Sequence, residues 1–229
     1  MQQAYRVLRV VAQAQTIRIV LMLRPNELML EELRTACNAL HTESSSGIKA
    51  IVLDFKSVYE SNPADVSLAP DVVKQAAAAV RALESPVLAV VRGPVSVEAG
   101  ALILVADLTL AARDAVLPVR TMGDENNDTL TGAQALRLGY INWSVPANAI
   151  DAEMTRILDM LREKSAMALR LTKASTRLEG DTPAQDAVAR LEALRQVNEF
   201  YHSQVMNTAD AAEGLRAFLE KRKPQWKNA

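Results

Sequence analysis

Hydrophobic and polar positions near the N-terminus follow a pattern that predicts β-strands around one helix. Residues 5–12 and 17–23 show the short alternation of strands, and residues 13–16 between them favour a hairpin connection. Leu28–Leu40 carries apolar residues at helical spacing, and Ile48–Phe55 is an apolar run typical of a buried strand. This part of the chain is therefore expected to belong to an α/β fold.

The segment Ser85–Val119 continues the alternation of strand and helix. A β-branched run at Val87–Val91 meets a glycine-proline turn, a helix-like apolar segment follows, and a second apolar run extends over Leu108–Ala112. Residues 70–84 precede this segment and predict a helix with proline in its first turn. Because a helix between two strands of one sheet favours a right-handed parallel crossover, we expect parallel strands with helices packed on them.

The pattern becomes helical after Leu130. The expected helices are Thr131–Leu138, Ala149–Leu178, Thr182–His202 and Ala209–Arg222. We therefore divide the chain into an α/β core over residues 1–146 and a helical C-terminal region over residues 147–229.

The amino-acid composition argues against several classes of function. The 229 residues contain 26 Lys and Arg against 27 Asp and Glu, without the basic surplus that nucleic-acid binding requires, so no nucleic-acid partner is expected. Apolar runs are too short for a membrane span, and the N-terminus lacks a signal-peptide pattern, so we expect a cytoplasmic protein without membrane contact. Cys37 is the single cysteine, and the two histidines are far apart in sequence, so no metal site is expected.

Several short motifs recur in a fixed order along nearly the whole chain. They are Arg24-Pro25-Asn26, IKAIVLDF at 48–55, Ala64-Asp65-Val66, Val91-Arg92-Gly93 with the turn at 97–102, Asp107, the stretch 131–146, and EG…AFLEKRKP at 213–224. Together they resemble the crotonase family, the enoyl-CoA hydratase/isomerase superfamily. The resemblance implies a crotonase-like ββα spiral core, followed by a helical region that mediates homotrimer formation, with trimers often paired into hexamers.

The resemblance also implies a site that binds an acyl-CoA thioester through two backbone N–H groups, which stabilise an enolate oxygen. The matching positions are Asn62 and Glu98, and Glu98 replaces a glycine. The positions that match the two hydratase glutamates hold Ala101 and Thr121, which cannot transfer protons as a carboxylate does. The paired-glutamate mechanism therefore does not carry over.

Two interpretations of the Glu98 side chain stay open, a catalytic carboxylate beside Ala101 or a negative charge that favours the start of a helix. By resemblance, Phe218 and Lys221 would contact the CoA adenine and phosphates from a neighbouring subunit, with Lys56 as a weaker phosphate contact. Lys221 equally fits a basic helix end that complements the helix dipole.

The resemblance thus predicts an enzyme that handles acyl-CoA by hydration, isomerisation or another enolate-forming step. It needs no cofactor besides the coenzyme A of its substrate. The alternative is a catalytically inactive crotonase-fold subunit or scaffold that assembles with an active paralogue.

Overall fold

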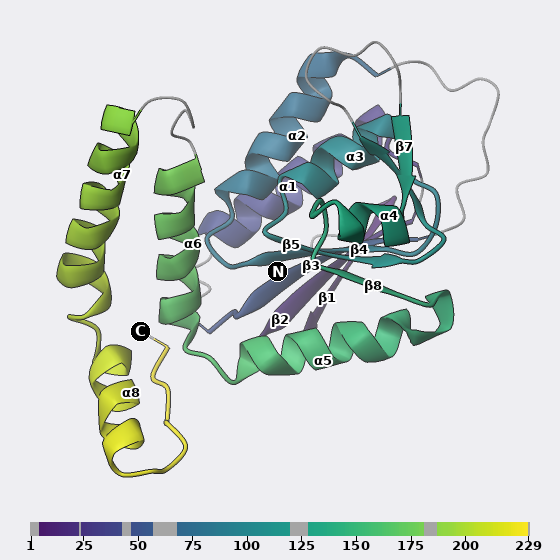
Figure 1. Ribbon diagram of the computed structural model, residues 1–229. Helices are drawn as coiled ribbons and strands as arrows, with labels where there is room; N and C mark the ends of the chain where they lie inside the picture. Colours follow the sequence, from purple (N-terminus) through teal and green to yellow (C-terminus); the bar gives the residue numbers. More distant parts are fainter. Residues whose placement is uncertain are drawn as a thin grey trace.

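The computed structural model describes residues 5–22, 24–42, 47–56, 68–119, 128–180 and 187–228. A sheet of six strands in the order β1-β2-β3-β4-β5-β8 forms its centre (Figure 1). The strands are β1 Leu8–Gln13, β2 Thr16–Leu21, β3 Ala50–Phe55, β4 Val87–Val91, β5 Leu108–Ala112 and β8 Trp143–Val145. β1 is antiparallel to β2, whereas every other neighbouring pair is parallel, as the predicted crossovers require.

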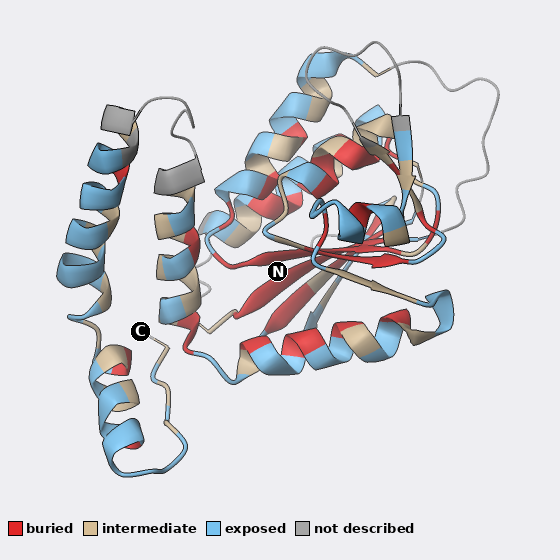
Figure 2. Ribbon diagram, in the orientation of Figure 1, coloured by how far each residue is buried: buried red, intermediate tan, exposed pale blue. Residues whose placement is uncertain are grey.

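Helices cover both faces of this sheet. The α-helices of the described residues are α1 Glu27–Thr42, α2 Pro70–Ala82, α3 Val97–Leu104, α4 Gly132–Arg137, α5 Ile150–Arg162, α6 Ala166–Gly180, α7 Ala187–Phe200 and α8 Ala209–Leu219. α1, α2 and α3 lie on one face and α5 lies on the other (Figure 1). Every residue of β3 and β4 is consequently buried, which explains their continuous apolar sequences (Figure 2).

The predicted hairpin between β1 and β2 is confirmed. Ala14 and Gln15 form its two-residue turn, with φ of 38° and 64°. Two successive positive φ values are the mark of the tight turns whose twist matches that of paired strands. Neither residue is glycine, so the turn adopts a left-handed backbone that its side chains do not favour.

A buried ion-pair network joins the sheet to α5. The Asp54 side chain in β3 is fully buried and accepts hydrogen bonds from Arg18 Nε at 2.9 Å and Arg92 Nε at 2.8 Å. Arg92 continues to Asp151 at the start of α5, with Nη2 to Oδ1 at 2.5 Å. Burial lowers the pKa of Arg92, but its hydrogen bonds to Asp151 and Asp54 outweigh this effect and hold the pKa above its ordinary value. Arg92 is therefore a charged link between the sheet and a covering helix.

The chain leaves the sheet after α5, and α6, α7 and α8 form a helical arm beside the core (Figure 1). Lys173 of α6 attaches the arm to the sheet, because its buried ammonium binds Asp107 Oδ2 at 2.7 Å and donates to the Ser85 carbonyl at 2.9 Å. The role of this arm in trimer formation and the division at residue 146 stay predictions. In the described part of the chain, no helix has the length and apolar character needed to cross a membrane.

The single helix predicted over Ala149–Leu178 is wrong, because α5 and α6 are separate helices. Ser165 lies between them, and its hydroxyl accepts from the Ala168 N–H at 3.2 Å. The C-terminal tail reinforces this corner, since the Asn228 side chain accepts from the Ala166 N–H at 2.9 Å. Capping from a distant segment therefore starts a new helix where the local periodicity continues.

A second, two-stranded sheet was not predicted. β6 Val116–Val119 pairs antiparallel with β7 Asp128–Thr131, and α4 follows directly. At the start of α4, a Cβ on Gly132 would lie 2.0 Å from the Ala112 carbonyl oxygen. Only glycine therefore lets α4 pack this closely on the end of β5.

Candidate active site

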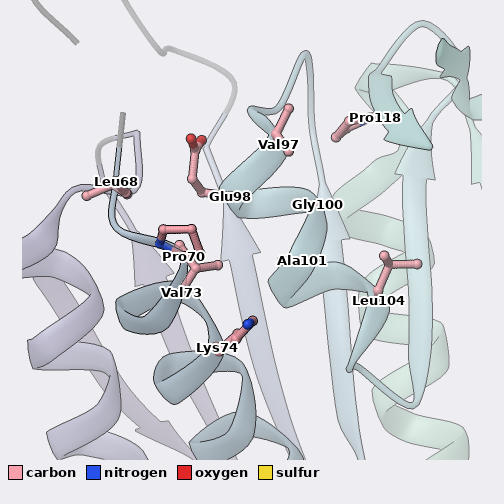
Figure 3. A pocket seen from close by; sticks show the side chains of 10 residues that line it. All are labelled: Leu68, Pro70, Val73, Lys74, Val97, Glu98, Gly100, Ala101, Leu104 and Pro118. Carbon is pink, nitrogen blue, oxygen red and sulfur yellow. The ribbon is translucent and has the colours of Figure 1, made fainter. Parts of the chain in front are cut away.

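A cavity of about 270 Å³ lies between the start of α2, the length of α3 and strand β6 (Figure 3). Its lining is mostly apolar, and Lys74 and Glu98 are its charged members. The lining residues are Leu68, Pro70, Val73, Lys74, Val97, Glu98, Gly100, Ala101, Leu104 and Pro118. An apolar cavity with a few polar groups is the usual form of a small-molecule site.

The first turn of α3, whose Val97 and Glu98 line the cavity, contains a backbone donor without an acceptor in the described part of the chain. Ser96 is the N-cap, and its hydroxyl accepts from the Ala99 N–H at 3.3 Å. The Glu98 N–H belongs to the same turn and has no acceptor among the described residues. A free N–H at the positive end of a helix is suited to binding a carbonyl oxygen that gains negative charge.

Close packing of β6 forms one wall of the cavity. A Cβ on Gly100 would lie 2.6 Å from Pro118 Cγ, so glycine at this position lets β6 approach α3. Ala101, where the sequence resemblance predicts the position of the first hydratase glutamate, also lines the cavity. The cavity wall is therefore small and apolar where the family resemblance places a carboxylate.

The Glu98 side chain takes part in the cavity lining and is 20% exposed. Its Oε2 atom is buried and accepts no hydrogen bond from the described residues, and Arg24 Nη2 lies 3.9 Å away. Glu98 and Ala101 both line the cavity, as their three-residue spacing on one helix predicts. A carboxylate is thus present at this site, one turn before the position that the resemblance indicated.

The other predicted site residues do not join this cavity within one chain. Lys56 follows β3 and is exposed, and the Phe218 side chain is 79% exposed on α8. Lys221 lies just after α8 with φ of 53°. Figure 1 shows α8 at the end of the helical arm, away from α2 and α3. A CoA contact by Phe218 or Lys221 at this cavity therefore requires a second copy of the chain.

Asn62 and Thr121 lie outside the described residues, so their predicted places in the site are not tested. Lys74 and Pro118 are cavity residues that sequence reasoning missed. The helical register of α2 relative to Pro70 would have placed Lys74 on the same face as Pro70, one turn later. The register of α2 alone does not indicate that this face packs beside α3.

Metal binding and thiol chemistry receive no support from the described residues. No group of three or more His, Cys, Asp or Glu side chains among them is arranged to hold a metal ion. Burial raises the pKa of Cys37 to about 12, which keeps the thiol protonated and unreactive.

The known proteins with related sequences have names that refer to CoA thioesters. A family model described as enoyl-CoA hydratase/isomerase matches residues 125–229. A probable mitochondrial enoyl-CoA hydratase of Dictyostelium discoideum is 27% identical over 101 residues, which are 44% of this chain and 34% of that protein. Methylmalonyl-CoA decarboxylase of Escherichia coli is 24% identical over 183 residues, which are 68% of this chain and 67% of that protein. The first of these matches thus spans about a third of the relative's length.

Solved structures share the fold over nearly the whole chain. The structure of an enoyl-CoA hydratase from Geobacillus kaustophilus matches with a TM-score of 0.81 at 18% identity, covering 99% of this chain and 98% of that chain. The fold is therefore the crotonase-like α/β fold that the sequence predicted. Over residues 125–229 the chain is thus similar in sequence to enoyl-CoA hydratases and isomerases, and over nearly its whole length it shares their fold.

Proposed function

We propose that the protein binds an acyl-CoA thioester in the cavity between α2 and α3 and stabilises its enolate. The observation that carries the proposal is the Glu98 N–H in the first turn of α3, which has no acceptor among the described residues and belongs to a residue that lines a mostly apolar cavity. The thioester oxygen would accept from this N–H and from the N–H of Asn62. Two such donors stabilise the charge that collects on the oxygen as the enolate forms.

The proton transfer in this proposal belongs to the Glu98 carboxylate. Ala101 cannot exchange a proton, and the buried Oε2 of Glu98 has no hydrogen-bond donor in the described part of the chain. A carboxylate at the cavity wall is suited to removing or returning a proton at the carbon next to the thioester. The proposal covers hydration, isomerisation or another reaction that passes through an enolate.

Coenzyme A enters only as part of the substrate, and no separate cofactor is required. Lys56, Phe218 and Lys221 are the proposed contacts for its phosphates and adenine. Because α8 lies away from the cavity within one chain, contacts by Phe218 and Lys221 require a homotrimer or hexamer (Figure 1). The proposed location of this assembly is the cytoplasm.

Calorimetric titration of the purified protein with crotonyl-CoA, acetyl-CoA and free CoA tests the proposal. We expect both thioesters to bind more tightly than free CoA, because only they carry the carbonyl oxygen that accepts from Glu98. Equal affinity for all three ligands, or no binding, would refute it. Glu98→Gln should retain thioester binding and lose turnover, which separates the carboxylate from the backbone N–H.

The second candidate is an inactive subunit that assembles with an active crotonase-fold partner. The apolar Ala101 in place of a carboxylate favours it. Co-purification of a second crotonase-fold chain, with no thioester binding by the isolated protein, supports this candidate. Turnover of any acyl-CoA by the isolated protein rules it out.

A further inference from the structure

We infer that the cavity selects short acyl chains that end in a carboxylate, and that Lys74 is the specificity-determining residue. The inference rests on the proposed function, because it requires a thioester bound in this cavity. Figure 3 shows the Glu98 carboxylate at one end of the cavity and the Lys74 side chain at the other, directed from α2 towards α3. The other described side chains of the lining are apolar.

The position of the thioester oxygen sets the direction of the acyl chain. An oxygen bound to the Glu98 N–H lies at the N-terminal end of α3, and the acyl chain then runs along α3 past Ala101 towards Leu104. At about 1.5 Å per residue, the six steps along the helix from Glu98 to Leu104 span about 9 Å. Lys74 lies on α2 beside this second end of the cavity (Figure 3). The end of a short acyl chain therefore meets the Lys74 ammonium.

The size of the cavity is suited to a short acyl group. Its volume of about 270 Å³ is smaller than the roughly 300–1,000 Å³ of typical ligand pockets. Val73 and Leu104 lie on its two facing helices and supply apolar contact for a methylene chain. A five-carbon dicarboxylic acyl group, such as glutaryl, combines a short methylene chain with a terminal anion.

The Lys74 ammonium is available to such an anion. Its ionic partner among the described residues is Asp71, with Nζ and Oδ1 3.9 Å apart and both side chains largely exposed, at 78% and 84%. An exposed pair at this distance is weak and contains no hydrogen bond. Because the ammonium remains in contact with water, binding a carboxylate there avoids the large desolvation cost of a buried ion pair.

The negative charge of Glu98, at the other end of the cavity from Lys74, favours the same orientation of the acyl chain. A terminal carboxylate beside Glu98 would face a carboxylate oxygen that has no hydrogen-bond donor among the described residues, so the reversed arrangement is repelled. Arg24, 3.9 Å from Glu98, weakens this repulsion but does not remove it. The two ends of the cavity therefore discriminate by charge.

Calorimetric titration with glutaryl-CoA and pentanoyl-CoA tests the inference, because the two ligands have equal carbon counts and differ in the terminal carboxylate. We expect glutaryl-CoA to bind tighter by on the order of fivefold at low salt, the upper range for an exposed ion pair, with the preference shrinking as salt is added. Lys74→Met should abolish the preference and keep pentanoyl-CoA binding, and Lys74→Glu should invert it. Lys164→Met, in the turn after α5, is the matched control and should change neither affinity.

The outcomes distinguish this inference from the proposed function. No binding of either thioester overturns the proposed function and the inference with it. Equal binding of both thioesters overturns the inference alone. A preference for glutaryl-CoA that survives Lys74→Met also overturns it, because the anion is then recognised elsewhere.

Discussion

Replacing Asp54 by alanine should destabilise the protein more than any exposed charge replacement in the same network. The Asp54 side chain is fully buried in β3 and binds two arginines, Arg18 and Arg92. Its removal leaves two guanidinium groups beside an empty site inside the fold. Breaking a buried ion pair by deleting one partner typically costs about 3–5 kcal/mol.

The structure places the expected cost at the lower end of this range. The Arg18 side chain is 34% exposed and can reach water, and Arg92 keeps its hydrogen bonds to Asp151. We therefore expect a loss of about 3 kcal/mol in the free energy of unfolding. For a chain of this length, that corresponds to a fall of about 6–12 °C in melting temperature.

Thermal unfolding followed by circular dichroism measures this change. Asp151→Ala is the matched control, because its side chain is 69% exposed and serves one arginine of the same network. It should cost about 1 kcal/mol or less. An Asp54→Ala variant that melts within about 2 °C of the parent would refute the argument, as would a larger loss in Asp151→Ala.

Two further predictions concern backbone packing and pH. Gly132→Ala should cost about 1–3 kcal/mol in unfolding free energy, because its Cβ overlaps a carbonyl oxygen. Gly47→Ala meets no atom of the described residues within 4 Å and should change the unfolding free energy by less than about 0.5 kcal/mol. Equal melting temperatures for the two variants would contradict the packing argument. The hydrogen bond from Arg222 lowers the pKa of Glu213 from 4.5 to about 2, so its stabilising contribution is present above pH 4.5 and is lost as the pH falls towards 2. Melting temperatures measured between pH 6 and about 2.5 should therefore fall less steeply in Glu213→Gln than in the parent, and parallel curves would contradict this assignment.

The parts of the fold that could be predicted are those fixed by local sequence. β4 and β5 have the bounds Val87–Val91 and Leu108–Ala112 that the apolar runs indicated, because both strands are buried on two faces. The break at Ser165 and the pairing of β6 with β7 could not be predicted in the same way. Both depend on contacts with segments that are distant in sequence, the C-terminal tail in one case and a partner strand in the other.

In the candidate site too, the features set by local sequence could be predicted and those set by tertiary packing could not. The shared face of Glu98 and Ala101 follows from helical spacing, and the structure places both at the cavity. Lys74 could not be assigned, because the approach of α2 to α3 is a property of the tertiary packing. Phe218 and Lys221 are exposed on the helical arm, so their predicted role depends on an assembly that the sequence of one chain does not specify.

The central claim is that the N–H of Glu98 binds the thioester oxygen. The most direct measurement compares crotonyl-CoA and free CoA affinities of Glu98→Pro and Glu98→Ala by calorimetry. Proline removes the N–H in a helical turn where that group has no intrahelical acceptor, whereas alanine removes only the carboxylate. We predict that Glu98→Ala keeps the tighter binding of crotonyl-CoA over free CoA and that a folded Glu98→Pro loses it. An undiminished preference in Glu98→Pro would contradict the account.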